Sequence, residues 1–287
     1  MSPLLCNNIT KVSYALIFLI ITCGSLQAET GPSAKRVPQR VISIDYCADQ
    51  YLLKLGTSSQ ILGVSPKSVA SFSFMREKAE NFNKVRPLAE ELISLKPDLV
   101  IRSFGGGKDI SKFLSQHKIP ILQIGFLDSM EEINRTIKNV SKALGNQAMG
   151  IRLVKDLNRR LISIPHTEKK KTALYIAAGG VTTGDGTLVH DIMTKGNLSN
   201  IIETRGWTDI PLEQLVSLRP NVIVHSYLND LTKNSGKWSP IHHPVTERFL
   251  KRNTAIAIPP ALVSCGGWYS LDAIEMISRA QSGYTIQ

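Results

Sequence analysis

Aromatic and basic side chains recur just after the apolar, strand-like runs of this 287-residue chain. An aromatic surface with one or two basic groups suits a large ligand that has flat and anionic parts. The predicted ligand-binding residues are Tyr46, Lys67, Arg102, Phe104, Trp207, Tyr227, Trp268 and Tyr269. The alternative for each of them is structural, in which a loop side chain covers the hydrophobic core.

The sequence carries no strong catalytic pattern. The glycine-rich stretch FGGGKD at residues 104–109 lacks the spacing and the final Ser or Thr of a phosphate-binding loop. No GxSxG motif is present. Cys47 stands at a predicted helix start, which can activate a thiol, yet we expect it to be a small buried apolar residue. No catalytic residue and no cofactor are therefore predicted.

The histidines and cysteines do not form a metal-binding pattern. The six histidines contain no HExxH motif, and the adjacent His242 and His243 point in different directions in regular structure. Two of the four cysteines lie in the first 28 residues, which leaves Cys47 and Cys265. An oxidising compartment permits a bridge between them, but two distant cysteines are not a disulfide framework. Whether they are free stays open, and no metal site is predicted.

Two stretches of the same design position the candidate residues. Residues 90–101 read EELISLKPDLVI and residues 213–224 read EQLVSLRPNVIV, with five of twelve paired positions identical. Each copy starts with leucines at helical spacing, and a proline then ends the predicted helix. An apolar run typical of a buried parallel strand follows the proline. One unit used twice, far apart in the chain, predicts two similar lobes.

Strand-like and helix-like segments alternate along the rest of the chain. The predicted strands include residues 40–44, 61–65, 119–124, 173–177 and 254–258, and the predicted helices include residues 46–55, 110–117 and 188–194. This alternation predicts an α/β fold of two Rossmann-like lobes with parallel sheets and a cleft between the lobes. Ligands bind beyond the carboxyl ends of parallel strands, which is where the candidate residues fall.

Two helical patterns follow one another near the middle of the chain. Ser129 and Glu132 form a capping box, and the apolar spacing continues to Gly145 and then resumes. About sixteen helical residues span roughly 25 Å, so a long helix at residues 146–165 is expected to join the lobes rigidly. The predicted lobes are residues 29–145 and residues 166–287.

The first 28 residues have the features of a cleavable signal peptide. Lys11 precedes an apolar run at residues 14–23, and Ala28 is a small residue suited to cleavage. The run is short for a membrane span. No lipid attachment is expected at Cys23, because Ile-Ile-Thr precedes it, where a small residue normally stands. A periplasmic protein without a lipid anchor is expected, with the exact cleavage site open.

The net charge of +11 permits a nucleic acid, an anionic lipid or an anionic ligand as a partner. The Lys and Arg residues are scattered, apart from a run at residues 169–171. We therefore interpret most of them as solvated surface. A monomer that binds no nucleic acid is predicted.

The order of a signal peptide, RVISI, LAEELISLKPDLVI, a central helix and PLEQLVSLRPNVIV resembles a known family. It is similar to the substrate-binding proteins of ABC importers for ferric siderophores, haem and cobalamin, over residues 40–279. The resemblance implies two lobes joined by one rigid helix, with an inner-membrane permease and its ATPase as partners. An acidic residue at the head of the motif in each lobe docks on permease arginines in that family. The matching positions are Glu90 and Glu213.

The resemblance leaves the ligand open among a ferric siderophore, haem and cobalamin. Cobalamin binders of the family carry a tryptophan six positions before each motif glutamate; Trp207 matches the second position, but Lys84 stands at the first. Haem binders usually use a ligating Tyr or His, and Tyr46 and Tyr227 are available for that role.

An anionic ferric chelate is the leading expectation, because Arg102 and Lys67 suit its charge. The hypothesis from another class is an exported two-lobed enzyme that uses the same cleft. An enzyme needs convergent acid, base or nucleophile side chains, and the loops offer aromatic and basic groups instead.

Overall fold

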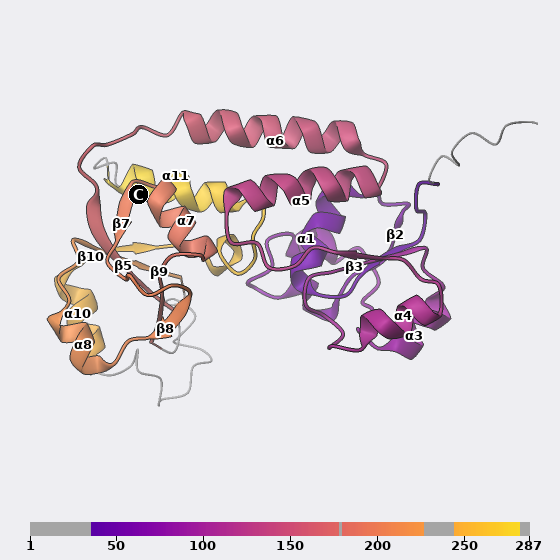
Figure 1. Cartoon of the computed structure of the whole chain (residues 1–287), viewed down its shortest axis with the longest axis horizontal. Coiled ribbons are helices and arrows are strands. Elements are labelled where there is room, and N and C mark those ends of the chain that lie inside the picture. Colours follow the sequence, from indigo (N-terminus) through magenta and orange to yellow (C-terminus); the bar gives the residue numbers. More distant parts are fainter. Residues whose placement is uncertain (1–35, 178–179, 227–243, 282–287) are drawn as a thin grey trace, which may run out of the picture. The chain divides into compact units, whose positions relative to one another are not determined.

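The computed structural model describes residues 36–177, 180–226 and 244–281. Residues 37–287 group as one unit by their internal contacts, and Figure 1 labels the helices and strands along the chain. The predicted signal peptide, Tyr227, His242 and His243 lie outside the described residues. Among the described helices, none is long and apolar enough to cross a membrane.

The first half of the chain builds a four-stranded parallel sheet. Its order is β2-β1-β3-β4. The strands are β1 (Val41–Ser43), β2 (Ile61–Gly63), β3 (Leu99–Arg102) and β4 (Ile121–Gln123). The central strands β1 and β3 are almost completely buried, as their continuous apolar runs predict.

Short helices connect these strands. They are α1 (Tyr46–Leu55), the 3₁₀ helix η1 (Pro66–Val69), α2 (Arg76–Ala79), α3 (Ala89–Leu95) and α4 (Ile110–Gln116). The limits of α1 are those predicted, because the Asp45 side chain accepts a hydrogen bond from the Ala48 amide and the chain leaves the helix at Gly56. The start of α1 therefore lies directly beyond the carboxyl end of β1.

Two long helices, α5 (Met130–Ala143) and α6 (Gln147–Ile162), pack side by side after a turn at Gly145 (Figure 1). Gly150 permits their close approach, because a Cβ atom there would lie 2.0 Å from Ser141 Oγ. Beyond this pair the chain enters the second sheet. The sixteen residues of α6 agree with the predicted long helix.

The second half builds another four-stranded parallel sheet, in the order β10-β9-β5-β7. The strands are β5 (Lys171–Ile176), β7 (Leu198–Asn200), β9 (Val222–His225) and β10 (Thr254–Ala257). The helices are α7 (Leu188–Lys195), α8 (Leu212–Ser217), α10 (Pro244–Arg252), α11 (Ser270–Gln281) and the 3₁₀ helix η3 (Pro260–Leu262). The α/β fold with parallel sheets is confirmed.

The repeated sequence unit is also a repeated structural unit. It forms α3 followed by β3 in the first half and α8 followed by β9 in the second half. Leu92 and Leu215 are the matching buried leucines of the two helices. Each repeated strand is an inner strand of its sheet, so Arg102 and His225, the last residues of β3 and β9, lie at the carboxyl edges of the two sheets.

A small antiparallel pair was not predicted. Strand β6 (Val181–Thr183) pairs with β8 (Trp207–Asp209), and Thr183 lies opposite Trp207. Strand β6 follows β5 directly and packs against it. This pair therefore carries Trp207 to the carboxyl end of the second sheet.

Candidate ligand-binding site

An open cavity of about 150 Å³ is lined by both halves of the chain. Its walls come from the start of α1, the loops after β3 and β4, the start of α7, strand β8 and the loop after η3. The lining residues used below are Tyr46, Cys47, Tyr51, Ser103, Phe104, Phe126, Asp128, Trp207 and Cys265. This position matches the predicted location of the site, beyond the carboxyl ends of parallel strands.

Tyr46 begins α1 and forms one wall of the cavity. Its ring meets Phe72 edge-on, with 4.8 Å between ring centroids, and meets Phe104 edge-on at 5.3 Å. Edge-to-face contacts of this kind are favourable for aromatic pairs. The three rings therefore hold one another in place, with Tyr46 in the middle.

Phe104 and Phe126 present almost parallel rings on the neighbouring wall. Their planes differ by 7° and their centroids are 6.1 Å apart. Phe104 follows β3, Phe126 follows β4, and the two residues are 39% and 77% exposed. Exposed aromatic rings are unusual for a side chain that contributes only to the core, so these two offer contact area to a ligand.

Trp207 faces the cavity from strand β8 and is 54% exposed. Its ring meets the buried Tyr175 edge-on at a centroid distance of 6.0 Å. Leu188 and Val189, at the start of α7, add apolar lining. The second half of the chain thus supplies a large amphipathic ring to the cavity, and the first half supplies Tyr46.

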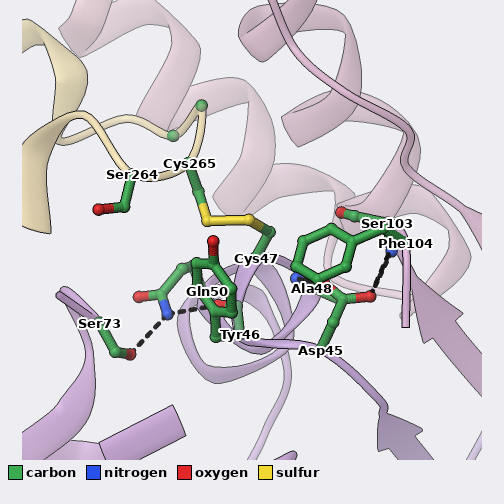
Figure 2. Close-up of a disulfide and its surroundings, with 12 residues drawn as sticks. Asp45, Tyr46, Cys47, Ala48, Gln50, Ser73, Ser103, Phe104, Ser264 and Cys265 are labelled. Atoms are coloured by element: carbon green, nitrogen blue, oxygen red, sulfur yellow. Dashed lines mark hydrogen bonds between the residues drawn. A yellow bond between two sulfur atoms is a disulfide. The ribbon is translucent and has the colours of Figure 1, made fainter. Parts of the chain in front are cut away.

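A disulfide bond between Cys47 and Cys265 forms part of the cavity wall (Figure 2). Cys47 belongs to α1 and Cys265 to the loop after η3, with 5.5 Å between their Cα atoms. The sequence left open whether these two cysteines are free, and the structure pairs them across a separation of 218 residues. The expectation that Cys47 is a small buried apolar residue is wrong, because it is only half-buried and its sulfur is bonded to Cys265. The bond links the two halves of the chain at the site.

Asp128 is the charged side chain among the described lining residues. Partial burial and the nearby Glu132 raise its pKa, while Arg205 acts in the opposite direction. Hydroxyl groups add polarity to the wall, and the lining residues that carry them are Tyr46, Tyr51, Ser103 and Ser264. The Tyr51 hydroxyl already donates to the Gly266 carbonyl at 3.0 Å. The described wall is therefore aromatic with a weakly acidic edge.

The two predicted basic residues do not line the cavity. Arg102 ends β3, and its guanidinium donates to Ser111 Oγ at 2.8 Å and to the Gly107 carbonyl at 3.3 Å. Lys67 is exposed on η1. Because Arg102 is held toward the start of α4, the described wall of the cavity carries no basic side chain.

Trp268 and Tyr269 are core residues and do not line the cavity. They are 7% and 1% exposed, and Phe74 stacks on Tyr269 at 4.4 Å. Trp268 meets Tyr51 edge-on, and Lys54 Nζ lies 5.4 Å from the Trp268 ring centroid. Burial raises the pKa of the Tyr269 hydroxyl above its usual range. Trp268 therefore packs behind the lining residue Tyr51, and Tyr269 packs against Trp268.

Sequence reasoning missed Phe126 and Asp128. Both follow β4, the strand predicted at residues 119–124, and the loop after that strand was left out of the candidate set. The rule that ligands bind at the carboxyl ends of strands applies to β4 as well, so the signal was present.

Comparison with known proteins decides the family. The family model described as periplasmic binding protein matches residues 41–237. The chain belongs to the periplasmic binding protein family. It is the substrate-binding component of an ABC transporter and not an enzyme, as its relatives in this family are binding proteins.

Three relatives illustrate the range of this periplasmic binding protein family. An uncharacterized ABC transporter substrate-binding lipoprotein of Bacillus subtilis is 24% identical over 267 residues, 86% of this chain and 81% of the relative. The vitamin B12-binding protein of Pectobacterium atrosepticum is 23% identical and covers 72% of this chain and 79% of its own length. The periplasmic haem-binding protein of Roseiflexus sp. RS-1 has a TM-score of 0.69 at 18% identity, covering 84% and 98% of the two chains.

In this periplasmic binding protein, Glu90 and Glu213 are exposed in the first turns of α3 and α8. Within the described part of the chain, neither carboxylate forms a salt bridge. The neighbouring Glu91 is different, because it accepts hydrogen bonds from Arg86, which lower its pKa. The two equivalent acids are thus available to a partner.

The described residues contain no group of three or more His, Cys, Asp or Glu side chains that could hold a metal ion. Tyr227, His242 and His243 lie outside that part of the chain.

Proposed function

We propose that this protein captures a bulky metal chelate without net negative charge, such as a neutral ferric siderophore or a corrinoid, and delivers it to a membrane permease. The observation that carries the proposal is the set of aromatic rings that line the cavity without being fully buried: Tyr46, Phe104, Phe126 and Trp207. Three of them have large exposed areas. Rings arranged in this way provide apolar contact area to a ligand that has flat or apolar faces.

The charge of the cavity wall narrows the class of chelate. The described lining contains Asp128 and no Lys or Arg. An acidic wall repels an anionic ligand and attracts a cationic one. The anionic ferric chelate expected from Arg102 and Lys67 is thus replaced by a neutral or cationic one, because those two cations lie elsewhere.

A corrinoid is the second candidate within the class. Trp207 stands where the family's cobalamin binders carry a tryptophan, and it lines the cavity together with Phe104. Lys84, at the position of the other expected tryptophan, donates to the backbone carbonyls of Ala79 and Phe82 instead. The first-half contact to a corrinoid would therefore come from Tyr46 and Phe104.

The delivery step involves the two equivalent glutamates. We propose that residues 29–145 and 166–287 are two lobes joined by the helix at residues 146–165, and that Glu90 and Glu213 each receive an arginine of a two-fold permease. Charge-assisted contacts of this kind are specific even when partly exposed. The proposal includes export by a signal peptide at residues 1–28, a soluble periplasmic monomer without a lipid anchor at Cys23, and an ATPase that powers the permease.

A charge series of chelates tests the ligand class. Purified protein is titrated with ferrichrome, which is a neutral ferric trihydroxamate, with cyanocobalamin, with haemin and with an anionic ferric tris-catecholate, at low and high salt. We expect saturable binding of a neutral chelate that changes little with ionic strength, and recovery of that chelate unchanged. Preferred binding of the tris-catecholate or haemin with strong salt dependence would overturn the charge argument, and chemical conversion of a chelate would overturn the binding role.

A matched pair of double variants tests docking. Glu90→Ala/Glu213→Ala removes the proposed contacts, whereas Glu80→Ala/Glu203→Ala removes two exposed acids elsewhere, one from each half of the chain. We expect normal ligand affinity in both variants and loss of transport in the first alone. Transport at the wild-type rate by the first variant would contradict the docking role.

A further inference from the structure

Asp45 connects β1 to α1 at the edge of the cavity, and its side chain is buried, with 4% exposure (Figure 2). It lies next to Tyr46 in the sequence but does not line the cavity. A buried carboxylate is costly unless hydrogen bonds or charges compensate it. The described residues compensate it with backbone amides.

Four backbone N–H groups donate to this one carboxylate. Its Oδ1 atom accepts from the Ala48 amide at 2.9 Å, which caps α1. Its Oδ2 atom accepts from three consecutive amides, those of Ser103 at 2.7 Å, Phe104 at 3.1 Å and Gly105 at 3.0 Å. Successive amides that converge on one anion form a nest, which fixes the backbone that carries them.

The loop held by this nest has little else in its sequence to fix it. It reads Ser-Phe-Gly-Gly-Gly, and Gly106 and Gly107 both have positive φ angles. The backbone of Gly105 runs against Ile44, the residue that follows β1, since a Cβ atom at Gly105 would lie 2.3 Å from the Ile44 carbonyl oxygen. On the other side, Gln123 Nε2 donates to the Ser103 carbonyl at 2.5 Å. The position of Phe104 therefore depends on Asp45 and on this close approach.

We infer that Asp45 is a positioning residue for ligand binding: its carboxylate fixes the loop at residues 103–105 so that the Phe104 ring stays against Tyr46 in the cavity wall. The inference rests on the proposed function, because it assigns Asp45 a part in the affinity of the proposed site. One carboxylate ties together the helix that carries Tyr46 and the loop that carries Phe104. A ligand then meets rings that are already in place, which lowers the entropic cost of binding.

Asparagine cannot replace this carboxylate. Its side chain has one acceptor oxygen and one NH₂ group, which only donates. If the oxygen caps α1, the NH₂ group faces the three loop amides, and donors then oppose donors. If the oxygen serves the loop amides, the cap of α1 is lost. The near-isosteric Asp45→Asn change should therefore release the loop or the cap while leaving the size of the residue unchanged.

Hydrogen exchange and a double-mutant cycle test the inference. The wild type, Asp45→Asn, Phe104→Ala and the double variant are compared by amide exchange at residues 103–105 and by titration with ferrichrome and cyanocobalamin. Ser129→Ala is the control, because it removes another helix cap, one that accepts from the Glu132 amide at 3.3 Å. Asp45→Asn is expected to weaken binding by about tenfold or more, in line with lost charge-assisted hydrogen bonds.

The expected results are specific to positioning. Exchange at residues 103–105 accelerates in Asp45→Asn and not in Ser129→Ala. Asp45→Asn adds little to the affinity loss of Phe104→Ala, because both changes remove the same wall. The inference would be overturned if the amides of residues 103–105 exchanged as slowly in Asp45→Asn as in the wild type, or if the affinity losses of Asp45→Asn and Phe104→Ala added up in the double variant. Either result would leave the proposed function intact. Unchanged affinity in Phe104→Ala, or no binding of either chelate by the wild type, would overturn the proposed site itself and with it the role of Asp45.

Discussion

Removal of the Cys47–Cys265 disulfide should cost a large part of the stability of this protein. The bond closes a chain segment with a sequence separation of 218 residues. In the chain-entropy description, a cross-link restricts the unfolded chain, and its stabilising effect grows with the logarithm of the loop length. For this separation the effect on the free energy of unfolding is about 5 kcal/mol at 25 °C, which is an upper value. A whole domain is typically stable by about 5–15 kcal/mol.

The assay is equilibrium unfolding in guanidinium chloride, followed by circular dichroism. Oxidised wild type, reduced wild type and Cys47→Ser/Cys265→Ser are compared, each starting at residue 29. We expect the double variant and the reduced wild type to unfold at clearly lower denaturant concentration, with a steeper dependence on denaturant because their unfolded chains are more expanded.

A free-thiol assay on the oxidised protein provides the control, since a formed bond leaves neither thiol reactive. Equal free energies of unfolding for the oxidised wild type and the double variant would refute the reasoning. That result would mean that the long cross-link does not restrict the unfolded chain.

Two further predictions follow from burial. Trp207→Ala should weaken chelate binding by about 1–3 kcal/mol with little change in stability, whereas Trp268→Ala should destabilise the fold by about 3–5 kcal/mol because its ring is buried. Titration calorimetry measures the first effect and denaturant unfolding measures the second. Equal losses of affinity and of stability in the two variants would contradict the placement of Trp207 in the cavity wall and of Trp268 in the core. Asp49 is fully buried, and burial raises its pKa to about 7 in spite of hydrogen bonds from Ser43 and Ser65. The folded protein then holds this proton more tightly than the unfolded chain, so the free energy of unfolding should fall as the pH rises from about 4 to 7, by roughly 1–4 kcal/mol. Asp49→Asn should flatten that part of the pH profile, and an unchanged slope in denaturant midpoints measured across this range would argue against it.

Local sequence signals predicted most of the regular structure. The limits of α1 followed from Asp45 and Gly56, and β3 and β9 followed from apolar β-branched runs after a proline. These elements are defined by neighbours in the sequence, so a single sequence is sufficient for them. Strand β6 has three residues, too few for any periodicity, and its pairing with β8 was not predictable.

The candidate site was less predictable because burial depends on distant segments. Phe104 and Trp207 reach the cavity, whereas Trp268 packs against Tyr51 and Phe74, which lie far away in the sequence. Nothing near Trp268 in the chain distinguishes an inward ring from an exposed one. The pairing of Cys47 with Cys265 was equally unpredictable, because only the fold brings these two distant cysteines together.

The central claim is that the aromatic wall binds a chelate and releases it unchanged. The most direct measurement is calorimetric titration of ferrichrome or cyanocobalamin into the wild type and into Phe104→Ala/Trp207→Ala, followed by recovery and chemical analysis of the chelate. The account predicts one-to-one binding to the wild type, binding weakened by about a hundredfold in the folded double variant, and an intact chelate. Equal affinity in the two proteins, or a chemically altered chelate, would contradict it.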